Sequence, residues 1–316
     1  MLINPILKEV NRLIIDAHVH IFDKICGRIK NNNTTDDGWG TIKCGNDFIR
    51  ILPPYNKKTQ FEPKSLIKYM DYENIDRAVL LQGSFWGNQN SLVKQALIDY
   101  PDRLAGAMYI EPWQDNAVEY FEKNIEYFDA IKLEISDTTG FSGWNKNFKL
   151  TDYMWLYKEL SKRNKTLVLD LGEVGSSSYQ TGGVREIIDK NSDIKIVICH
   201  LAQPRKHYFD NKALMDNWKN QIKLSKYGNV SFDTASLSAY FFKEDYPHIT
   251  GRKFFDMAIK IAGSKRIIMG TDMPGNSLKA TYRQMVYLPE IYGKYIGLTG
   301  EELADVMGYN ARRIYF

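Results

Sequence analysis

Cysteine is scarce in this chain of 316 residues, and the three that occur, Cys26, Cys44 and Cys199, lie far apart. Three scattered cysteines exclude a disulfide framework and a four-cysteine zinc site, and they favour a reducing compartment. Long apolar runs are also missing, since no stretch approaches the roughly 18 residues that a membrane span needs. No basic-then-apolar leader opens the chain. We therefore expect a cytoplasmic protein that does not bind a membrane.

A strong charge of one sign is absent as well. The 42 basic and 38 acidic residues leave a formal net charge of +4, and no basic run is interleaved with aromatic residues. This mild balance argues against a nucleic-acid partner. With 44% hydrophobic residues and no internal repeat or linker, the chain is typical of a single domain over residues 1–316 with a large core. The expected partner is a small-molecule substrate, and self-association into a homo-oligomer is left open.

Short apolar runs alternate with helix-like stretches along the whole chain. The strand-like runs are Ile14–Phe22, Ala78–Gln82, Leu104–Ile110, Ala130–Ile135, Thr166–Leu171, Lys195–His200, Val230–Asp233 and Arg266–Gly270. Eight strands, each followed by a helix, predict a parallel (β/α)8 barrel, the TIM-barrel fold of the α/β class. A doubly wound open sheet is the alternative. No Gly-x-Gly-x-x-Gly follows the first strand, which argues against the dinucleotide-binding form of that alternative.

One segment, residues 23–60, interrupts this alternation directly after the first strand. It is polar, rich in Gly and Asn, and lacks clear periodicity. Segments of this length without periodicity are uncommon inside compact domains and usually have a function. We expect a lid or substrate loop.

The first strand ends in two histidines, His18 and His20, two residues apart. Alternate strand side chains share a face, so regular alternation would place Asp16, His18 and His20 on one side of the strand. Two imidazoles on one face can hold a metal ion. Asp16 would then lie one layer deeper in the barrel, and a pair of packed histidines is the plainer alternative.

Other polar side chains also end predicted strands, where active sites of such barrels gather. They are Lys132 and Glu134 (fourth strand), Asp170 (fifth), His200 (sixth), Asp233 (seventh) and Asp272 (after the eighth). Lys132 and Glu134 alternate with apolar neighbours, which sends both side chains into the barrel. They could pair with each other; otherwise Lys132 is expected to bind a substrate carboxylate or oxyanion.

Structural roles stay open for the remaining strand-end residues. Asp272 is also a suitable helix cap, His200 a possible core histidine, and Asp170 a candidate for local pairing; for Asp233 the structural role is favoured. In the loop after the sixth strand, Arg205 and His207 are candidates to recognise an anionic substrate, with a solvated loop as the equal alternative.

Four motifs in this order resemble the amidohydrolase superfamily, in particular the branch that includes aminocarboxymuconate-semialdehyde, resorcylate and carboxyvanillate decarboxylases. They are Ile15-Asp16-Ala17-His18-Val19-His20, Cys199-His200-Leu201, Gly270-Thr271-Asp272-Met273-Pro274 and Met307-Gly308-Tyr309-Asn310-Ala311-Arg312-Arg313-Ile314-Tyr315. The resemblance implies that His18 and His20 are metal ligands, that His200 activates water or moves a proton, and that Asp272 binds the metal and shuttles protons.

The chain departs from the family pattern at the end of the fifth strand, where Asp170 stands in place of the usual histidine. A carboxylate can also bind zinc or manganese. We therefore expect a divalent ion held by His18, His20, Asp170 and Asp272, and the second carboxylate favours manganese. Some lactonases of the superfamily work without metal, so a metal-independent enzyme remains an alternative.

These residues predict a metal-dependent hydrolase in which metal-activated water attacks an amide, ester or lactone. His200, Asp272 and Lys132 are the expected catalytic groups, and Arg205 and Glu134 are expected to bind a small anionic substrate. The alternatives are non-oxidative decarboxylation of an aromatic or unsaturated acid, which uses the same groups, and a barrel that only binds a ligand.

Overall fold

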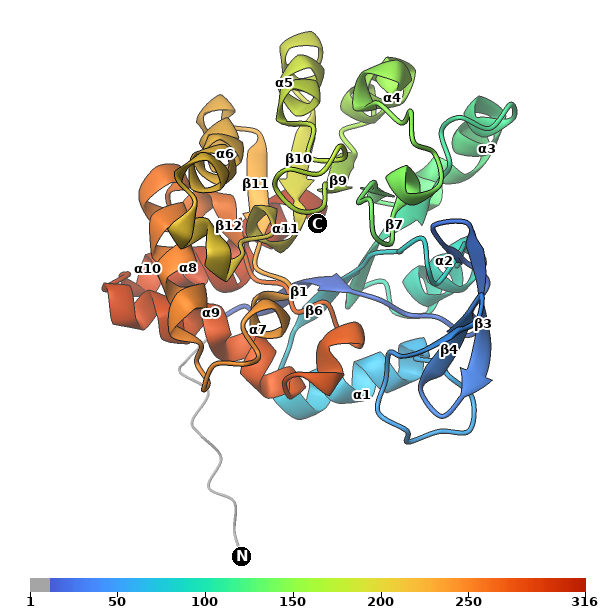
Figure 1. Ribbon diagram of the computed structural model, residues 1–316, viewed down its shortest axis with the longest axis horizontal. Helices are drawn as coiled ribbons and strands as arrows, with labels where there is room; N and C mark the ends of the chain where they lie inside the picture. Colours follow the sequence, from blue (N-terminus) through green and yellow to red (C-terminus); the bar gives the residue numbers. More distant parts are fainter. Residues whose placement is uncertain (1–11) are drawn as a thin grey trace, which may run out of the picture.

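Eight parallel strands form the centre of the computed structural model, which describes residues 12–316 (Figure 1). In order around the sheet they are β1 (Ile15–Val19), β6 (Arg77–Leu80), β7 (Leu104–Tyr109), β8 (Ala130–Glu134), β9 (Thr166–Asp170), β10 (Lys195–Ile198), β11 (Val230–Asp233) and β12 (Ile267–Ile268). The first and last strands meet, because Ala17 N donates to Met269 O at 3.0 Å and Val19 bridges Met273. The predicted (β/α)8 barrel is confirmed.

Helices follow the strands in sequence and lie around the outside of the sheet (Figure 1). They are α1 (Pro63–Glu73), α2 (Asn90–Asp99), α3 (Ala117–Asn124), α4 (Met154–Lys162), α5 (Thr181–Lys190), α6 (Lys212–Ile222), α7 (Leu237–Tyr240), α8 (Ile249–Ala262), α9 (Tyr282–Ile296), α10 (Gly300–Ala304) and α11 (Asn310–Tyr315). Capping boxes begin α9 at Thr281 and α10 at Thr299. Within residues 12–316, no helix is both long and apolar enough to cross a membrane.

Apolar side chains fill the amino-terminal part of the barrel. This buried cluster contains Ile15, Ala17, Val79, Leu81, Ala105, Ala107, Ala130, Val168, Val197, Cys199 and Ile268. Ala311 and Tyr315 of α11 belong to the same cluster, so this helix closes the amino-terminal end of the barrel. Thr166 Oγ1 and Lys195 Nζ, at the starts of β9 and β10, both donate to Ile314 O at 3.1 Å. The polar residues of interest therefore lie above an apolar floor.

Strand β1 contains a bulge between Asp16 and Val19. Ala17 faces the apolar interior, yet His18 also points into the barrel, so strict alternation fails here. The prediction that Asp16 shares a face with the two histidines is wrong. Its carboxylate instead accepts hydrogen bonds from Thr271 Oγ1 at 2.6 Å and from the Tyr282 hydroxyl of α9 at 3.0 Å. Burial raises the pKa of Asp16 to about 7, and these donors oppose that shift.

The segment at residues 23–60 contains a second sheet instead of an irregular loop. Its four antiparallel strands are β2 (Arg28–Ile29), β3 (Asn32–Gly38), β4 (Thr41–Cys44) and β5 (Asp47–Arg50). The strands β3 and β4 stand at the edge of the view in Figure 1. A two-residue turn joins β4 to β5, and its first residue, Gly45, has a φ of +61° that suits such hairpins. The polar sequence of β3 hid these strands, since only Thr34 of that strand is buried.

Candidate active site

A cavity of about 220 Å³ opens at the carboxyl ends of the barrel strands. Its lining residues are His20, Gly83, Phe85, Lys132, Glu134, Ser136, Thr138, Thr139, Asp170, His200, Gln203, Arg205, Ser236, Tyr240 and Asp272. Most of the residues predicted from strand ends therefore line one space. His18 is completely buried beneath it.

Three predicted ligands meet at the base of this cavity. The ligand atoms of His18, His20 and Asp272 all lie within 4.8 Å of one another. Asp272 Oδ1 is 3.0 Å from His20 Nε2 and 3.7 Å from His18 Nε2. Two imidazole nitrogens and a carboxylate oxygen that converge in this way form a donor set that suits a divalent ion.

The opposite nitrogen of each ligand histidine is held by a second contact. His18 Nδ1 is 2.9 Å from Asp233 Oδ2, and His20 Nδ1 is 2.8 Å from the carbonyl oxygen of Leu81. Such partners fix the ring orientation and leave Nε2 for a metal. Burial lowers the pKa of His18 to about 4, although the charge of Asp233 opposes this shift. His18 is therefore neutral near pH 7, as a metal ligand must be.

Asp272 sits in a backbone conformation that is uncommon for a residue with a side chain, with a φ of +64°. Its Oδ2 accepts hydrogen bonds from Ser236 Oγ at 2.5 Å and from Asn276 Nδ2 at 3.3 Å. Burial alone would raise the pKa of Asp272. The hydrogen bond with His20 and the charges of the nearby histidines instead hold it well below the usual range, so Asp272 is ionised near neutral pH.

The predicted strand at Lys195–His200 ends two residues early, and His200 begins a left-handed turn. Four successive residues, His200 to Gln203, have φ values of +61°, +50°, +56° and +52°. Strained backbone of this kind persists only where surrounding contacts hold it. Here Asp233 Oδ1 accepts from His200 N at 2.7 Å, and Trp218 Nε1 donates to Leu201 O at 2.9 Å. The turn places the His200 ring 4.8 Å, centroid to centroid, from that of His18.

Asp170 lies beside His200 and apart from the three converging ligands. Its Oδ2 is 3.3 Å from His200 Nε2, and its Oδ1 accepts from Gln203 Nε2 at 2.7 Å. Within residues 12–316, no group of converging ligand atoms includes Asp170. Burial would lower the pKa of His200, but the charge of Asp170 and its hydrogen bond raise it to about 9. The structure thus pairs the fourth predicted ligand with an imidazolium.

Lys132 and Glu134 are buried in the cavity wall without pairing to each other. Glu134 Oε2 accepts from the backbone N–H of Ser84 at 2.7 Å, and Thr139 donates to its other oxygen. Lys132 Nζ lies 3.5 Å from His18 Nε2, and no carboxylate of the described chain lies within 4.0 Å of it. Burial would lower the pKa of Lys132, but the charges of Glu134, Asp170 and Asp272 help to raise it. Lys132 is therefore an ammonium that makes no direct ion pair with a described residue and can bind an anion in the cavity.

Arg205 lines the cavity, whereas His207 lies outside it. The Arg205 guanidinium stands 3.9 Å from the ring centroid of Tyr240, and its Nε is 3.1 Å from Glu173 Oε2. His207 is exposed beside Glu173. Sequence patterns did not indicate Ser236, Tyr240 or Gln203, because all three lie beyond the strand ends. Gln203 follows the turn at His200, Ser236 directly precedes α7, and Tyr240 ends that short helix.

The geometry defines a TIM barrel with a metal-type cluster at the carboxyl end of its strands. A family model described as amidohydrolase matches residues 15–316. The chain belongs to this amidohydrolase family, whose members are enzymes. No curated protein matches the chain significantly.

Solved structures share the fold at low sequence identity. An amidohydrolase from Burkholderia multivorans with bound zinc has a TM-score of 0.68 and 14% identity, covering 96% of this chain and 99% of that one. A probable 2-pyrone-4,6-dicarboxylic acid hydrolase from Acinetobacter baumannii with bound citric acid has a TM-score of 0.66 and 17% identity, covering 95% and 98%. A 5-carboxyvanillate decarboxylase from Sphingomonas paucimobilis has a TM-score of 0.50 and 13% identity, covering 79% and 81%. At these identities the likeness concerns the fold alone.

Proposed function

We propose that the protein is a metal-dependent hydrolase that cleaves an ester, lactone or amide bond in a small anionic molecule. The observation that carries this proposal is the convergence of His18, His20 and Asp272 within 4.8 Å at the open end of the barrel. Zinc and manganese both accept such donors, and the fold neighbour from B. multivorans holds zinc. When bound, the ion would lower the pKa of a water molecule toward about 7 and polarise the substrate carbonyl.

The protein's own groups divide the proton transfers between them. Asp272, ionised near neutral pH, accepts the proton of the attacking water as the new carbon–oxygen bond forms. His200 is protonated below about pH 9, and its buried Nδ1 has no partner among the described residues. It donates a proton to the leaving oxygen or nitrogen as the scissile bond breaks. Asp170 holds the His200 ring through Nε2.

Two cations of the cavity recognise the negative charge of the substrate. Lys132 Nζ has no carboxylate within 4.0 Å in the described chain, and the Arg205 guanidinium lines the same cavity. A carboxylate held by these groups would keep the scissile carbonyl near the metal ligands. The cavity of about 220 Å³ restricts the reacting part of the substrate to a small group.

Metal analysis and a substrate panel test the proposal. Protein purified without chelator or nickel resin should contain about one divalent ion per chain. The His20→Ala variant should lose it, and the control His207→Ala, which changes an exposed histidine, should retain it. Lactones and aryl esters with and without a carboxylate are then assayed with a pH indicator. Full activity in metal-free protein would replace this proposal by a metal-independent lactonase, and release of carbon dioxide from aromatic acids without hydrolysis would replace it by a decarboxylase.

A further inference from the structure

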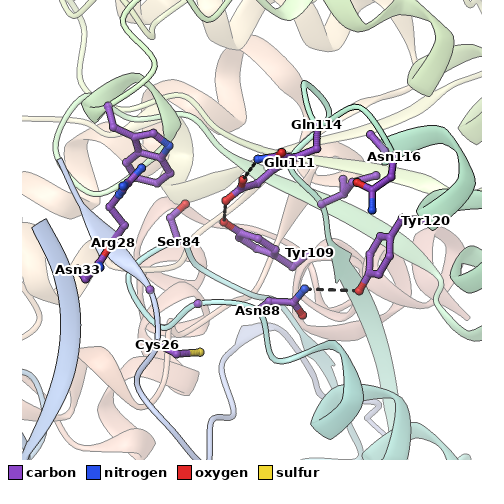
Figure 2. A pocket seen from close by; sticks show the side chains of 15 residues that line it. Cys26, Arg28, Asn33, Ser84, Asn88, Tyr109, Glu111, Gln114, Asn116 and Tyr120 are labelled. Atoms are coloured by element: carbon purple, nitrogen blue, oxygen red, sulfur yellow. Dashed lines mark hydrogen bonds between the residues drawn. The ribbon is translucent and has the colours of Figure 1, made fainter. Parts of the chain in front are cut away.

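A second pocket, of about 450 Å³, lies beside the metal-type cavity and is shown in Figure 2. Its walls come from residues 26–33 of the insertion, from residues 84–88 after β6, and from residues 110–120 at the start of α3. Trp144 closes one side. None of the residues assigned above to metal binding or proton transfer lines this pocket.

Backbone contacts fix the insertion against the loop after β6. Arg28 N donates to Ser84 O, and Cys26 N donates to Trp86 O, both at 3.0 Å. A Cβ atom at Gly27 would lie 2.1 Å from Ser84 O, so the chain can approach this closely only at a glycine. The position of Arg28 beside Ser84 is therefore determined by main-chain contacts.

Two opposite charges line the pocket without pairing to each other or to another charged group of residues 12–316. The Arg28 guanidinium lies 5.7 Å from the ring centroid of Trp144. On the other side, Glu111 accepts hydrogen bonds from the Tyr109 hydroxyl at 3.0 Å and from Gln114 Nε2 at 2.9 Å (Figure 2). These neutral donors hold the Glu111 carboxylate in place and leave its charge unneutralised.

Ser84 lies between these charges in the view of Figure 2. Ser84 is only 1% exposed, and its hydroxyl forms a hydrogen bond with the Tyr109 hydroxyl. The Tyr120 hydroxyl, which already accepts from Asn90 Nδ2 at 2.8 Å, still has its own proton to donate.

We propose that this pocket binds an α-amino-acid group, with the ligand carboxylate at Arg28 and the ligand ammonium at Glu111. A zwitterion neutralises both charges at once, which an anion or a cation alone cannot do. The proposal goes beyond the proposed hydrolysis, because it uses none of the metal-site residues.

The same loop also connects the pocket to the hydrolytic cavity. Ser84 lines the pocket, and its N–H donates to the Glu134 carboxylate of the cavity at 2.7 Å. The amino-acid group therefore belongs either to a separate small molecule or to the distal end of the substrate. Both sources share the ammonium and carboxylate that the pocket recognises.

Binding of free amino acids tests the proposal without reference to catalysis. Glycine, L-glutamine and L-glutamate are titrated into wild-type protein, with amide chemical shifts followed by NMR. We expect saturable binding of at least one of them at millimolar concentration, with shifts centred on residues 84–88 and 110–120. One charged amino-acid group is expected to bind with a dissociation constant below about 10 mM. Absence of binding by all three amino acids at this concentration would overturn the proposal.

Modified ligands and matched variants identify the two contacts. The methyl ester of the amino acid that binds lacks the carboxylate, and its N-acetyl form lacks the ammonium. Each should bind about tenfold or more weakly, the scale of one charge-assisted hydrogen bond. The Arg28→Gln variant should no longer distinguish the methyl ester, and Glu111→Gln should no longer distinguish the N-acetyl form. The control Glu119→Gln, an exposed carboxylate of α3 outside the pocket, should behave as wild type. Equal affinity of all three ligand forms for wild type would refute the assignment.

A bifunctional ligand distinguishes the two sources. Glutamate γ-hydroxamate carries both an amino-acid group and a metal-binding group. In zinc-loaded protein, glutamate γ-hydroxamate is compared with L-glutamine and with acetohydroxamate, each of which carries one of its two groups. If glutamate γ-hydroxamate binds at least tenfold tighter than either, the amino-acid group belongs to the distal end of the substrate. Similar affinities, with L-glutamine and acetohydroxamate bound together, would support a separate amino acid. Only this experiment depends on the metal site. If the protein binds no metal, the titrations with free amino acids still test the proposal.

Discussion

The Asp170→Asn variant tests whether Asp170 acts through His200 or as a metal ligand. Asp170 Oδ2 lies 3.3 Å from His200 Nε2, and its charge outweighs burial and raises the pKa of His200 from 6.5 to about 9. This rise corresponds to about 3 kcal/mol in favour of the imidazolium. Asparagine has the same shape without the charge, so we expect most of this stabilisation to disappear without creating a cavity.

The pH dependence of stability identifies the pair. A His200 pKa that is higher in the folded state stabilises the fold fully below about pH 6.5, and this stabilisation is lost as the pH rises through about 9. The pKa of Asp170 is held well below its usual range; burial opposes this, but the charge of His200 outweighs it. The contribution of Asp170 is therefore present above about pH 4. In metal-free protein, the free energy of unfolding of wild type should exceed that of the variant by up to about 3 kcal/mol between about pH 5 and 6.5.

Thermal unfolding in chelator and zinc titration are the two assays. The variant should melt about 5–10 °C lower near pH 6, and the difference should narrow above about pH 9. Its zinc affinity should change less than about threefold, because the ligand cluster does not include Asp170. Glu173→Gln, which removes a half-buried carboxylate in the neighbouring loop, serves as the control. A tenfold loss of zinc affinity together with a pH-independent loss of stability would refute the pairing role and favour Asp170 as a ligand.

Further changes test the remaining assignments. His200→Asn and Asp272→Asn should each lower turnover by roughly 10²-fold or more, and only the latter should reduce bound metal on elemental analysis; unchanged turnover would remove that residue from the mechanism. Asp233→Asn should weaken metal binding about 10- to 100-fold in chelator competition, because it frees the His18 ring, and wild-type affinity would show that Asp233 does not orient the ligand. Replacing residues 30–50 by a short glycine–serine linker should raise KM or abolish turnover while circular dichroism still reports a folded barrel; wild-type kinetics would contradict a lid role.

The barrel could be predicted from the sequence because its signal is distributed over eight repeats of the same pattern. Strand β11 has the predicted bounds. The bulge in β1 was missed because its cause is non-local: Thr271 and Tyr282, about 250 residues away, attract the carboxylate of Asp16. Turn glycines such as Gly45 were the available signal for the second sheet.

The site was predictable where residues end strands and not where loops supply them. His18, His20, His200 and Asp272 converge because barrel topology brings strand ends together. The pairing of Asp170 with His200 depends on the left-handed turn at His200. This turn could not be predicted, because non-glycine residues rarely adopt a positive φ and no local sequence pattern indicates it.

The proposed ligands come from opposite ends of the chain. His20 follows the first strand and Asp272 follows the last, 252 residues apart, where β1 and β12 close the cylinder. An ion shared by them would act as a removable crosslink across this seam. Closing a loop of that length restricts the unfolded chain by on the order of 5 kcal/mol in the usual loop-entropy relation. Extracting the metal would remove this crosslink, while the backbone hydrogen bond from Ala17 N to Met269 O still joins the two strands. The metal-free barrel is therefore expected to stay folded but to melt at a lower temperature.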